Sequence, residues 1–256
     1  FSLNKKLDNT SLEKSLLQLG NKHSILKTSV IYKEVSIPRQ VVPKQRKLEL
    51  NFLDLTNEVK KEGIFANLKI KDKSRGFDLE EDSLLRLTAV KMNEEHFKII
   101  MSSHHIIMDG WSLPIVVHDL LEYYEANTTN LNLGDLSKER QNFGDYVQLI
   151  NKRKDSIDYW RDLLNGLEEK TSIIEEGKPE NGTKEVKDCQ LLLDKNDTKK
   201  LRKLSENYHV TINTIIETLW GILLQKYNHV TDSIFGKVVS GRDVDIPGIE
   251  QMVGLF

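Results

Sequence analysis

The strongest constraint on the fold lies between residues 96 and 124, where the patterns of a buried strand, a polar corner and an amphipathic helix follow one another. The stretch HFKIIMSSHHI at 96–106 is apolar on both faces in its middle, which is typical of a buried strand. The helix predicted next has Ser112 as its N-cap, Pro114 in its first turn and apolar residues at helical spacing as far as Tyr124. The residues between them, HHIIMDG, therefore form a strand-to-helix corner.

Hydrophobic periodicity predicts further elements on both sides of this corner. A leucine-lined helix is expected at 11–22, where Asn9, Thr10 or Ser11 can serve as the cap. The other predicted elements are strands at 23–35 and 47–55, a helical segment at 56–70, a helix at 143–167 with a break near Lys154, helices at 196–208 and 211–227, and a strand at 233–242. The charged, glycine-containing segment 171–188 is the best candidate for a linker.

Composition excludes several classes of protein. The 37 basic and 39 acidic residues leave no net field that would recruit nucleic acid or an anionic membrane. The single cysteine, Cys189, excludes an intramolecular disulfide and any multi-cysteine metal site, and nothing beside it marks it as a nucleophile. No stretch predicts a membrane span or a signal peptide, so we expect a cytoplasmic protein. Because both ends of the chain are apolar, we also expect a fragment of something longer.

The corner holds the candidate catalytic groups. Side chains alternate along a strand, so His104 and His105 point to opposite faces unless the strand has ended, and periodicity does not choose between them. An imidazole is well suited to holding or accepting a proton near neutral pH. Three roles are open to Asp109, namely catalytic acid, histidine orienter or buried anion, while Gly110 permits a tight corner. Residue types alone leave a functional histidine and a hydrogen-bonded core histidine about equally open.

Other chemistries fit the sequence less well. Adjacent histidines rarely chelate one ion, so no metal site is expected from His104, His105 and Asp109. His118 is expected at a solvated or rim position of the following helix. The chain has no nucleophile elbow of the G-x-S-x-G type, no P-loop and no Rossmann glycine pattern.

Several stretches together resemble the condensation domains of nonribosomal peptide synthetases, which share a fold with chloramphenicol acetyltransferase. HHIIMDGWS at 104–112 matches the HHxxxDG motif of that family, and the stretch at 210–243, which ends in VSGRD, is a close match. KHSILKTSV at 22–30 is similar to the RHExLRTxF block, with lysines replacing both arginines and serine replacing glutamate. RGFDLEEDSLLRLTAV at 75–90 is similar to the PFDLxxxPLLR block but lacks both prolines.

The resemblance implies a fold. It is the α/β (α+β) chloramphenicol acetyltransferase-like fold, in which a mixed sheet is flanked by helices and two lobes enclose a tunnel. In these terms residues 1–170 form a nearly complete first lobe with the HHxxxDG motif, 171–188 a linker, and 189–256 the truncated start of the second lobe.

The resemblance also implies a reaction and roles for the corner residues. An acceptor amine attacks a donor thioester, both carried on phosphopantetheine arms of carrier proteins, and an amide is formed with no cofactor bound directly. His105 would be catalytic, either as a general base or by positioning the amine, and His104 would be structural. Asp109 would pair with Arg242 and tie the two lobes together, and Gly110 would serve a close-packed corner.

The implied partners are the upstream and downstream peptidyl carrier protein domains and the adjacent adenylation domain of the same synthetase, with no nucleic acid or membrane. Three alternatives stay open. An epimerisation domain shares HHxxxDG but has a glutamate-glycine-histidine block where this chain has KVVSGRD. A small-molecule acetyltransferase shares the histidine, and a non-catalytic platform or carrier-docking fragment shares the fold.

Overall fold

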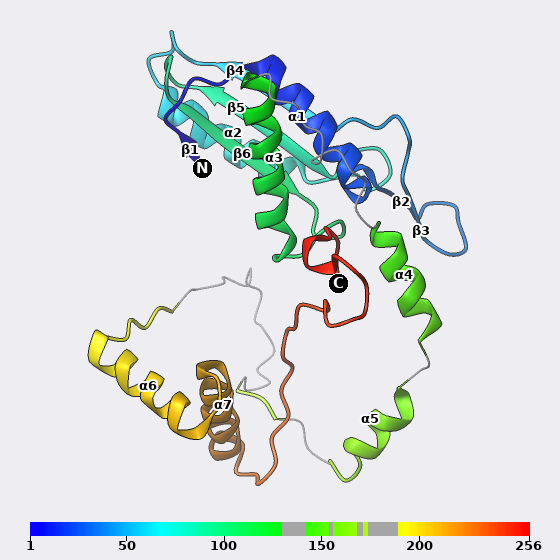
Figure 1. Ribbon diagram of the computed structural model, residues 1–256, viewed down its shortest axis with the longest axis vertical. Helices are drawn as coiled ribbons and strands as arrows, with labels where there is room; N and C mark the ends of the chain where they lie inside the picture. The colour runs from blue at the N-terminus through cyan, green and yellow to red at the C-terminus, as the bar shows by residue number, and fades with distance from the viewer. Residues whose placement is uncertain (130–141, 154–155, 168–170, 174–188) are drawn as a thin grey trace, which may run out of the picture. The chain divides into compact units, whose positions relative to one another are not determined.

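The computed structural model describes residues 1–129, 142–153, 156–167, 171–173 and 189–256 (Figure 1). The chain forms two compact units, one made of residues 1–153 and 240–256 and the other of residues 154–239. The linker expected at 171–188 lies outside the described residues except at 171–173. The lobe boundaries inferred from the resemblance therefore stay a prediction.

A four-stranded mixed sheet organises the first unit. Its strands are β1 (Ser2–Leu3), β4 (Glu49–Asp54), β5 (Leu85–Lys91) and β6 (Phe97–Ser103). Their spatial order is β1-β6-β5-β4, with β5 antiparallel to β6 and parallel to β4. This sheet and the helices around it confirm the predicted mixed α/β class.

The central strand β5 was absent from the sequence-based prediction. Every residue of β5 from Leu85 to Val90 is buried, because strands lie on both of its edges and helices cover both of its faces. Leu85 to Ala89 do alternate apolar and polar residues, but both faces of β5 are buried, because Arg86 and Thr88 are covered as well.

The two faces of β5 pack against different helices, as the alternation of strand side chains requires. Leu85, Leu87 and Ala89 belong to the main core, which also contains residues of α1 (Asn9–Lys22) and α3 (Ser112–Thr129). Val90 belongs to a smaller cluster with residues of α2 (Lys61–Arg75). Figure 1 shows α1 and α3 on the near side of the sheet and α2 on its far side.

Most predicted elements exist, with shifted bounds. The strand expected at 23–35 is instead a 3₁₀ turn (Ser24–Lys27) and a short strand β2 (Ser29–Ile31), which pairs with β3 (Arg39–Val41). The cap of α1 is Asp8, whose carboxylate accepts the Ser11 amide at 2.6 Å, because the helix begins earlier than its leucine pattern. The prediction of Asn9, Thr10 or Ser11 as the cap was therefore wrong.

The helical segment between the two units breaks as expected, since α4 (Phe143–Lys152) ends two residues before Lys154 and α5 (Ile157–Leu163) follows. The second unit contains α5, α6 (Lys195–Tyr208) and α7 (Ile212–Asn228), close to their predicted positions. The segment 233–242 forms no strand, because no described strand lies beside it to supply the ladder hydrogen bonds. No helix among the described residues is long and apolar enough to cross a membrane.

A buried ion cluster fastens α1 to α3. The two carboxylate oxygens of Asp119 lie 2.8 Å from Lys22 Nζ and 2.6 Å from His23 Nε2, and all three side chains are almost fully buried. Burial alone would raise the pKa of Asp119, but hydrogen bonds from His23 and Lys22 outweigh it and lower the pKa from 3.8 to about 2. Asp119 therefore stays ionised wherever the protein is folded near neutral pH.

Replacing Asp119 tests this cluster. Asp119→Asn leaves Lys22 without its counter-ion, which we expect to lower the free energy of unfolding by about 3–5 kcal/mol at neutral pH. The native carboxylate contributes fully above the unfolded pKa of about 3.8, and its contribution is lost as pH falls towards the folded pKa of about 2. Urea denaturation across this range should therefore show the two proteins converge on acidification. Glu125→Gln, on an exposed position of the same helix, is the control and should change little.

Candidate functional site

Strand β6 ends at Ser103, so both motif histidines lie in the turn beyond it. The alternation rule of strands no longer applies there, and the environment of each ring decides its role. The backbone N–H of His104 still continues the ladder by donating to Leu84 O at 2.9 Å.

The ring of His104 is held in place. Its Nδ1 accepts the backbone N–H of Ile106 at 3.1 Å, and the ring stands edge-to-face with Phe77 at a centroid distance of 6.1 Å. A nitrogen that accepts a hydrogen bond carries no proton, so Nδ1 is the deprotonated nitrogen of this imidazole. The ring of His104 thus stabilises the turn after β6.

His105 lies beside it with an exposed side chain. None of the residues that the structure describes forms a hydrogen bond or ion pair with its imidazole. Of the two adjacent rings, His105 is therefore the one with neither nitrogen bonded to a described residue.

Asp109 and Arg242 form the ion pair that the resemblance implied. Nη1 of Arg242 lies 2.8 Å from Oδ2 of Asp109, and Nη2 lies 3.2 Å from Oδ1. The side chains are only 10% and 4% exposed, respectively. Burial alone would raise the pKa of Asp109, but hydrogen bonds from Arg242 and Ser112 lower it below the ordinary value of 3.8. The carboxylate is fixed as a buried anion.

Ser112 joins this pair to α3 and to the C-terminal segment, residues 240–256. Its amide and its hydroxyl each lie 2.8 Å from Asp109 Oδ1, and the hydroxyl accepts from Arg242 Nη2 at 3.0 Å and from the Gly254 amide at 3.1 Å. Ser112 is the first residue of α3 rather than its N-cap, and the Asp109 carboxylate accepts its amide, one of the four that a helix leaves without a partner at its start. This role of Ser112 was not predicted from the sequence, although the Asp-x-x-Ser spacing of residues 109–112 could have indicated it.

The segment 240–256 packs onto the same unit as the motif. Asp109 donates its amide to Gly254 O at 3.0 Å, and the Arg242 guanidinium lies 3.9 Å from the centroid of the Phe256 ring. That ring also contacts Phe143 and Tyr146 of α4, with centroids 5.2 and 4.6 Å away. Both members of the pair lie in one compact unit, where the pair anchors the segment 240–256. That it joins two lobes stays a prediction, like the lobe boundaries.

The described residues give Gly110 no close packing, so its expected packing role stays a prediction. Gly110 is exposed, its φ is not positive, and a Cβ built there meets nothing within 4 Å. The close approaches occur in the segment 240–256. A Cβ on Gly254 would overlap the Phe143 ring, and a Cβ on Gly241, whose φ is +68, would lie 2.9 Å from Phe256 Cβ. These contacts join residues distant in sequence, so no local pattern predicted them.

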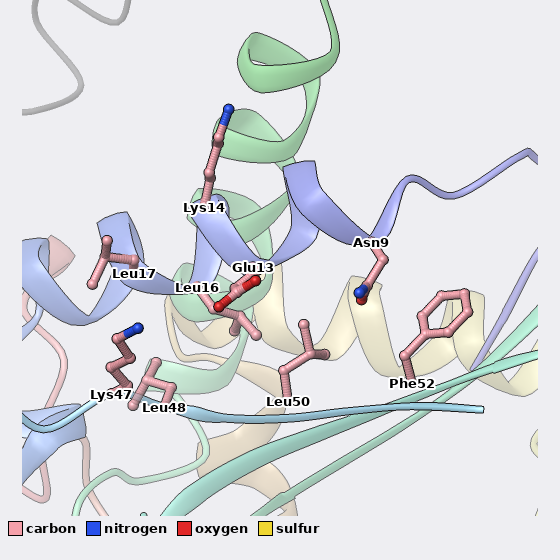
Figure 2. A pocket seen from close by; sticks show the side chains of 9 residues that line it. All are labelled: Asn9, Glu13, Lys14, Leu16, Leu17, Lys47, Leu48, Leu50 and Phe52. Carbon is pink, nitrogen blue, oxygen red and sulfur yellow. The ribbon is translucent and has the colours of Figure 1, made fainter.

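Two other features do not add to this site. His118, exposed as expected, lies with Asp119 and Glu122 in a group whose ligand atoms are within 4.8 Å, but both Asp119 oxygens already bind Lys22 and His23. A cavity of about 430 Å³ lies between α1 and β4 (Figure 2). It is lined by Asn9, Glu13, Lys14, Leu16, Leu17, Lys47, Leu48, Leu50 and Phe52, none of which belongs to the motif.

The whole chain, residues 1–256, matches the family model of the Condensation domain. It is 36% identical over 260 residues to tyrocidine synthase 2 of Brevibacillus parabrevis, an alignment that covers 100% of this chain and 7% of that protein. It is 34% identical over 254 residues to bacitracin synthase 1 of Bacillus licheniformis, over 96% of this chain and 5% of that protein. The chain therefore spans less than a tenth of the length of either relative.

Solved structures support the fold. The X-domain from teicoplanin biosynthesis aligns with a TM-score of 0.73 at 22% identity, over 100% of this chain and 57% of that one. The epimerization domain from the third module of tyrocidine synthetase B aligns with a TM-score of 0.71 at 15% identity, over 100% and 58%. At these identities the likeness establishes the fold, and this chain covers a little over half of each structure.

A double-mutant cycle tests the Asp109–Arg242 pair. Asp109→Ala and Arg242→Ala should each destabilise the protein by about 3–5 kcal/mol, because each leaves a buried charge unpaired. The double variant should lose less than the sum, with a coupling of about 1–3 kcal/mol. Hydrogen exchange of residues 240–256 should accelerate in all three variants. Asp243→Asn, at the exposed position next to Arg242, is the control; purely additive losses would contradict the pairing.

A glycine pair tests how closely the two positions are packed. Gly110→Ala places its Cβ in open space and should change the free energy of unfolding by less than about 0.5 kcal/mol. Gly254→Ala must displace the Phe143 ring and should cost about 1–3 kcal/mol. Thermal denaturation of the two variants measures the difference, and an equal loss in both would support a packing role for Gly110.

Proposed function

The chain belongs to the condensation-domain family, and we propose that it takes part in amide-bond formation between two carrier-bound substrates. The donor would be an aminoacyl or peptidyl thioester and the acceptor an aminoacyl amine, each presented on a phosphopantetheine arm. The single observation that carries this proposal is the corner itself: an exposed His105, whose imidazole bonds no described residue, lies next to a histidine and an aspartate that are both fixed by other contacts.

The chemistry asks for one orienting or proton-accepting group. The acceptor nitrogen attacks the thioester carbonyl carbon, the C–N bond forms, the C–S bond breaks, and the sulfur leaves as a thiol. The nitrogen must lose a proton and the departing sulfur must gain one. We assign His105 to the attacking nitrogen, either as the base that takes its proton or as the hydrogen-bond partner that holds it in line.

Asp109 is not a proton donor in this scheme. Both of its oxygens are hydrogen-bonded by Arg242, and Ser112 adds further bonds to one of them. Its lowered pKa keeps it ionised, so it has no proton to give near neutral pH. We assign to Asp109 and Arg242 the support of the corner's geometry, and to His104 the support of the turn that carries His105.

Gly110 takes a different supporting role in this proposal. Because a Cβ there would meet no protein atom within 4 Å, the missing side chain leaves space rather than allowing tight packing. We propose that this space lies on the path of the reacting groups. Gly110→Ala should then slow the reaction although it leaves stability unchanged.

The partners implied are the carrier protein domains that deliver donor and acceptor and an adenylation domain that loads them, in the cytoplasm. The relatives' names, which describe synthases of peptide products such as tyrocidine and bacitracin, support a place in peptide assembly. Epimerisation has weaker support, because the likeness to the tyrocidine epimerization domain is one of fold and this chain has KVVSGRD at the position of the expected block.

A peptide-bond assay tests the proposal. The intact protein is mixed with one carrier loaded with an aminoacyl donor and another loaded with an acceptor, and the dipeptidyl product is followed by mass spectrometry. His105→Ala should lower product formation by about 10²- to 10⁴-fold, the usual contribution of an acid–base or orienting group.

His118→Ala is the matched control, because this histidine is 68% exposed on α3 and lies outside the corner; it should retain native activity. Product formed at the native rate by His105→Ala would contradict the assignment of His105. No product from the native protein, with both carriers shown to bind, would favour a docking platform instead.

A further inference from the structure

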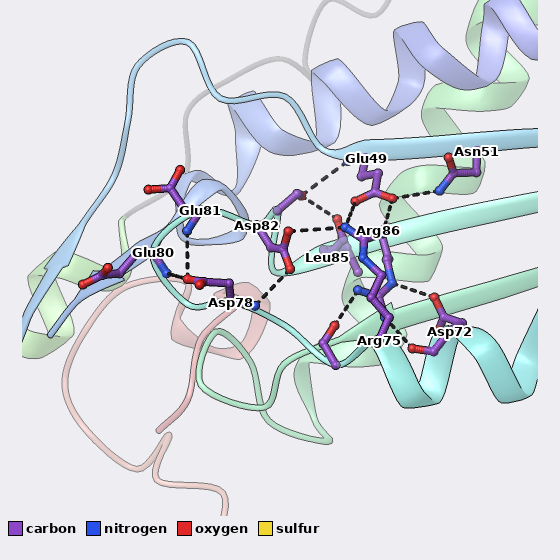
Figure 3. Close-up of polar contacts among 12 residues, drawn as sticks. Glu49, Asn51, Asp72, Arg75, Asp78, Glu80, Glu81, Asp82, Leu85 and Arg86 are labelled. Carbon is purple, nitrogen blue, oxygen red and sulfur yellow. Dashed lines mark hydrogen bonds and ion pairs between the residues drawn. The ribbon is translucent and has the colours of Figure 1, made fainter. Parts of the chain in front are cut away.

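Arg86 is a charged residue at the centre of the sheet. It lies in β5 and is 2% exposed, which is rare for arginine. Its Nε donates to Asp72 Oδ1 at 2.6 Å, Nη2 donates to Asp72 O at 2.8 Å, and Nη1 donates to Gly76 O at 2.7 Å (Figure 3). The guanidinium thus holds the last turn of α2 and the residue that follows it.

Burying such a charge contributes little net stability, because desolvation offsets the Coulomb attraction. In other proteins a buried ion pair can often be replaced by hydrophobic residues of similar volume without loss of stability. The arginine is therefore better explained by its effect on the positions of neighbouring groups. Its remaining contact, an aromatic ring, shows which groups these are.

Phe77 is that contact. Gly76, with φ +61, ends α2 and turns the chain so that the Phe77 ring lies over Arg86, with the guanidinium carbon 4.1 Å from the ring centroid. The same ring meets His104 at 87°. Arg86 and His104 thus contact one aromatic ring, although they lie on different segments of the chain.

The register of the sheet brings these groups together. Arg86 lies directly opposite Ser102 in the β5–β6 pair, and the Ser102 hydroxyl donates to the second carboxylate oxygen of Asp72. His104 lies just beyond the end of β6, two residues after Ser102, and its ring meets the Phe77 ring that Arg86 also contacts. Asp72, Arg86 and Phe77 therefore support the end of β6 from the α2 side of the sheet.

We propose that Arg86 and Phe77 are positioning residues for the catalytic corner, acting through the ring of His104. This inference rests on the proposed role of His105. His104 accepts the Ile106 amide through Nδ1, and its carbonyl accepts the Ile107 amide at 3.3 Å. The orientation of His104 therefore sets the turn in which His105 sits, and Phe77 sets the orientation of His104.

Variants at Phe77 and Arg86 separate this role from simple stability. Phe77→Leu keeps an apolar side chain but removes the ring, and Arg86→Lys keeps the charge but loses the planar group that stacks and makes the forked hydrogen bonds. A misplacement of about 1 Å can cost about 100-fold in rate. We expect kcat for dipeptide formation to fall by about 10- to 100-fold in both variants, with KM for the carriers unchanged. Phe77→Tyr, which keeps the aromatic ring, should retain the native kcat.

Arg75→Lys is the matched control. Arg75 belongs to the neighbouring polar network, where it bonds Glu49 and Asp82 (Figure 3), and it is 44% exposed. Of the two arginines, Arg86 is the one that stacks on Phe77. It should leave kcat unchanged. Equal losses in Arg75→Lys and Arg86→Lys, or native kcat in Phe77→Leu, would overturn the inference.

A second readout does not depend on activity. Nitrogen NMR of His104 reports which ring nitrogen carries the proton, and hydrogen exchange reports the protection of the Ile106 and Ile107 amides. Phe77→Leu should change which ring nitrogen of His104 carries the proton, and it should speed hydrogen exchange of both amides by about 10-fold or more. Arg75→Lys should change neither signal. If the native protein forms no product, the proposed reaction fails, and these signals still decide whether Phe77 positions the corner. Unchanged signals in Phe77→Leu would contradict it.

Discussion

The buried pair of Asp109 and Arg242 is the interaction on which the rest of the site depends. It joins the loop after β6 to a segment more than a hundred residues later, and Ser112 extends it into the first turn of α3. Such a pair adds little stability by itself, but the loss of either member strands a charge in the core. Its value is geometric, because a two-point contact between planar groups permits few orientations.

The corner is held from both faces of the sheet, and this arrangement separates support from chemistry. On the α3 side, Arg242 and Ser112 engage the Asp109 carboxylate and keep it ionised. On the α2 side, the stack of Arg86 on Phe77 reaches His104. Only His105 is left exposed and unengaged among the described polar groups of the motif. Rigid neighbours around one free imidazole are what a positioned catalytic group requires.

Fold likeness alone does not choose the reaction. An X-domain and an epimerization domain both align with this chain at TM-scores above 0.7. One architecture therefore carries proteins with different names and roles, and function must be argued from the site. In this chain the site that function must be argued from is the corner, where the VSGR arginine reaches Asp109 and a Cβ at Gly110 would meet no described atom within 4 Å.

Local patterns in the sequence determined the elements whose periodicity is visible within a few turns or residues: α1, α3, α6, α7, β4 and β6, together with the corner between β6 and α3. The Asp109–Arg242 pair came from the family resemblance, because a separation of 133 residues leaves no local signal. Tertiary structure alone decided that β5 is the buried centre of the sheet, that Ser112 bridges the ion pair, and that Gly254 rather than Gly110 is sterically constrained. The physical reason is common to all three. Burial on every side and contacts between distant segments arise only when the chain has folded, whereas hydrophobic periodicity is a local property of the sequence.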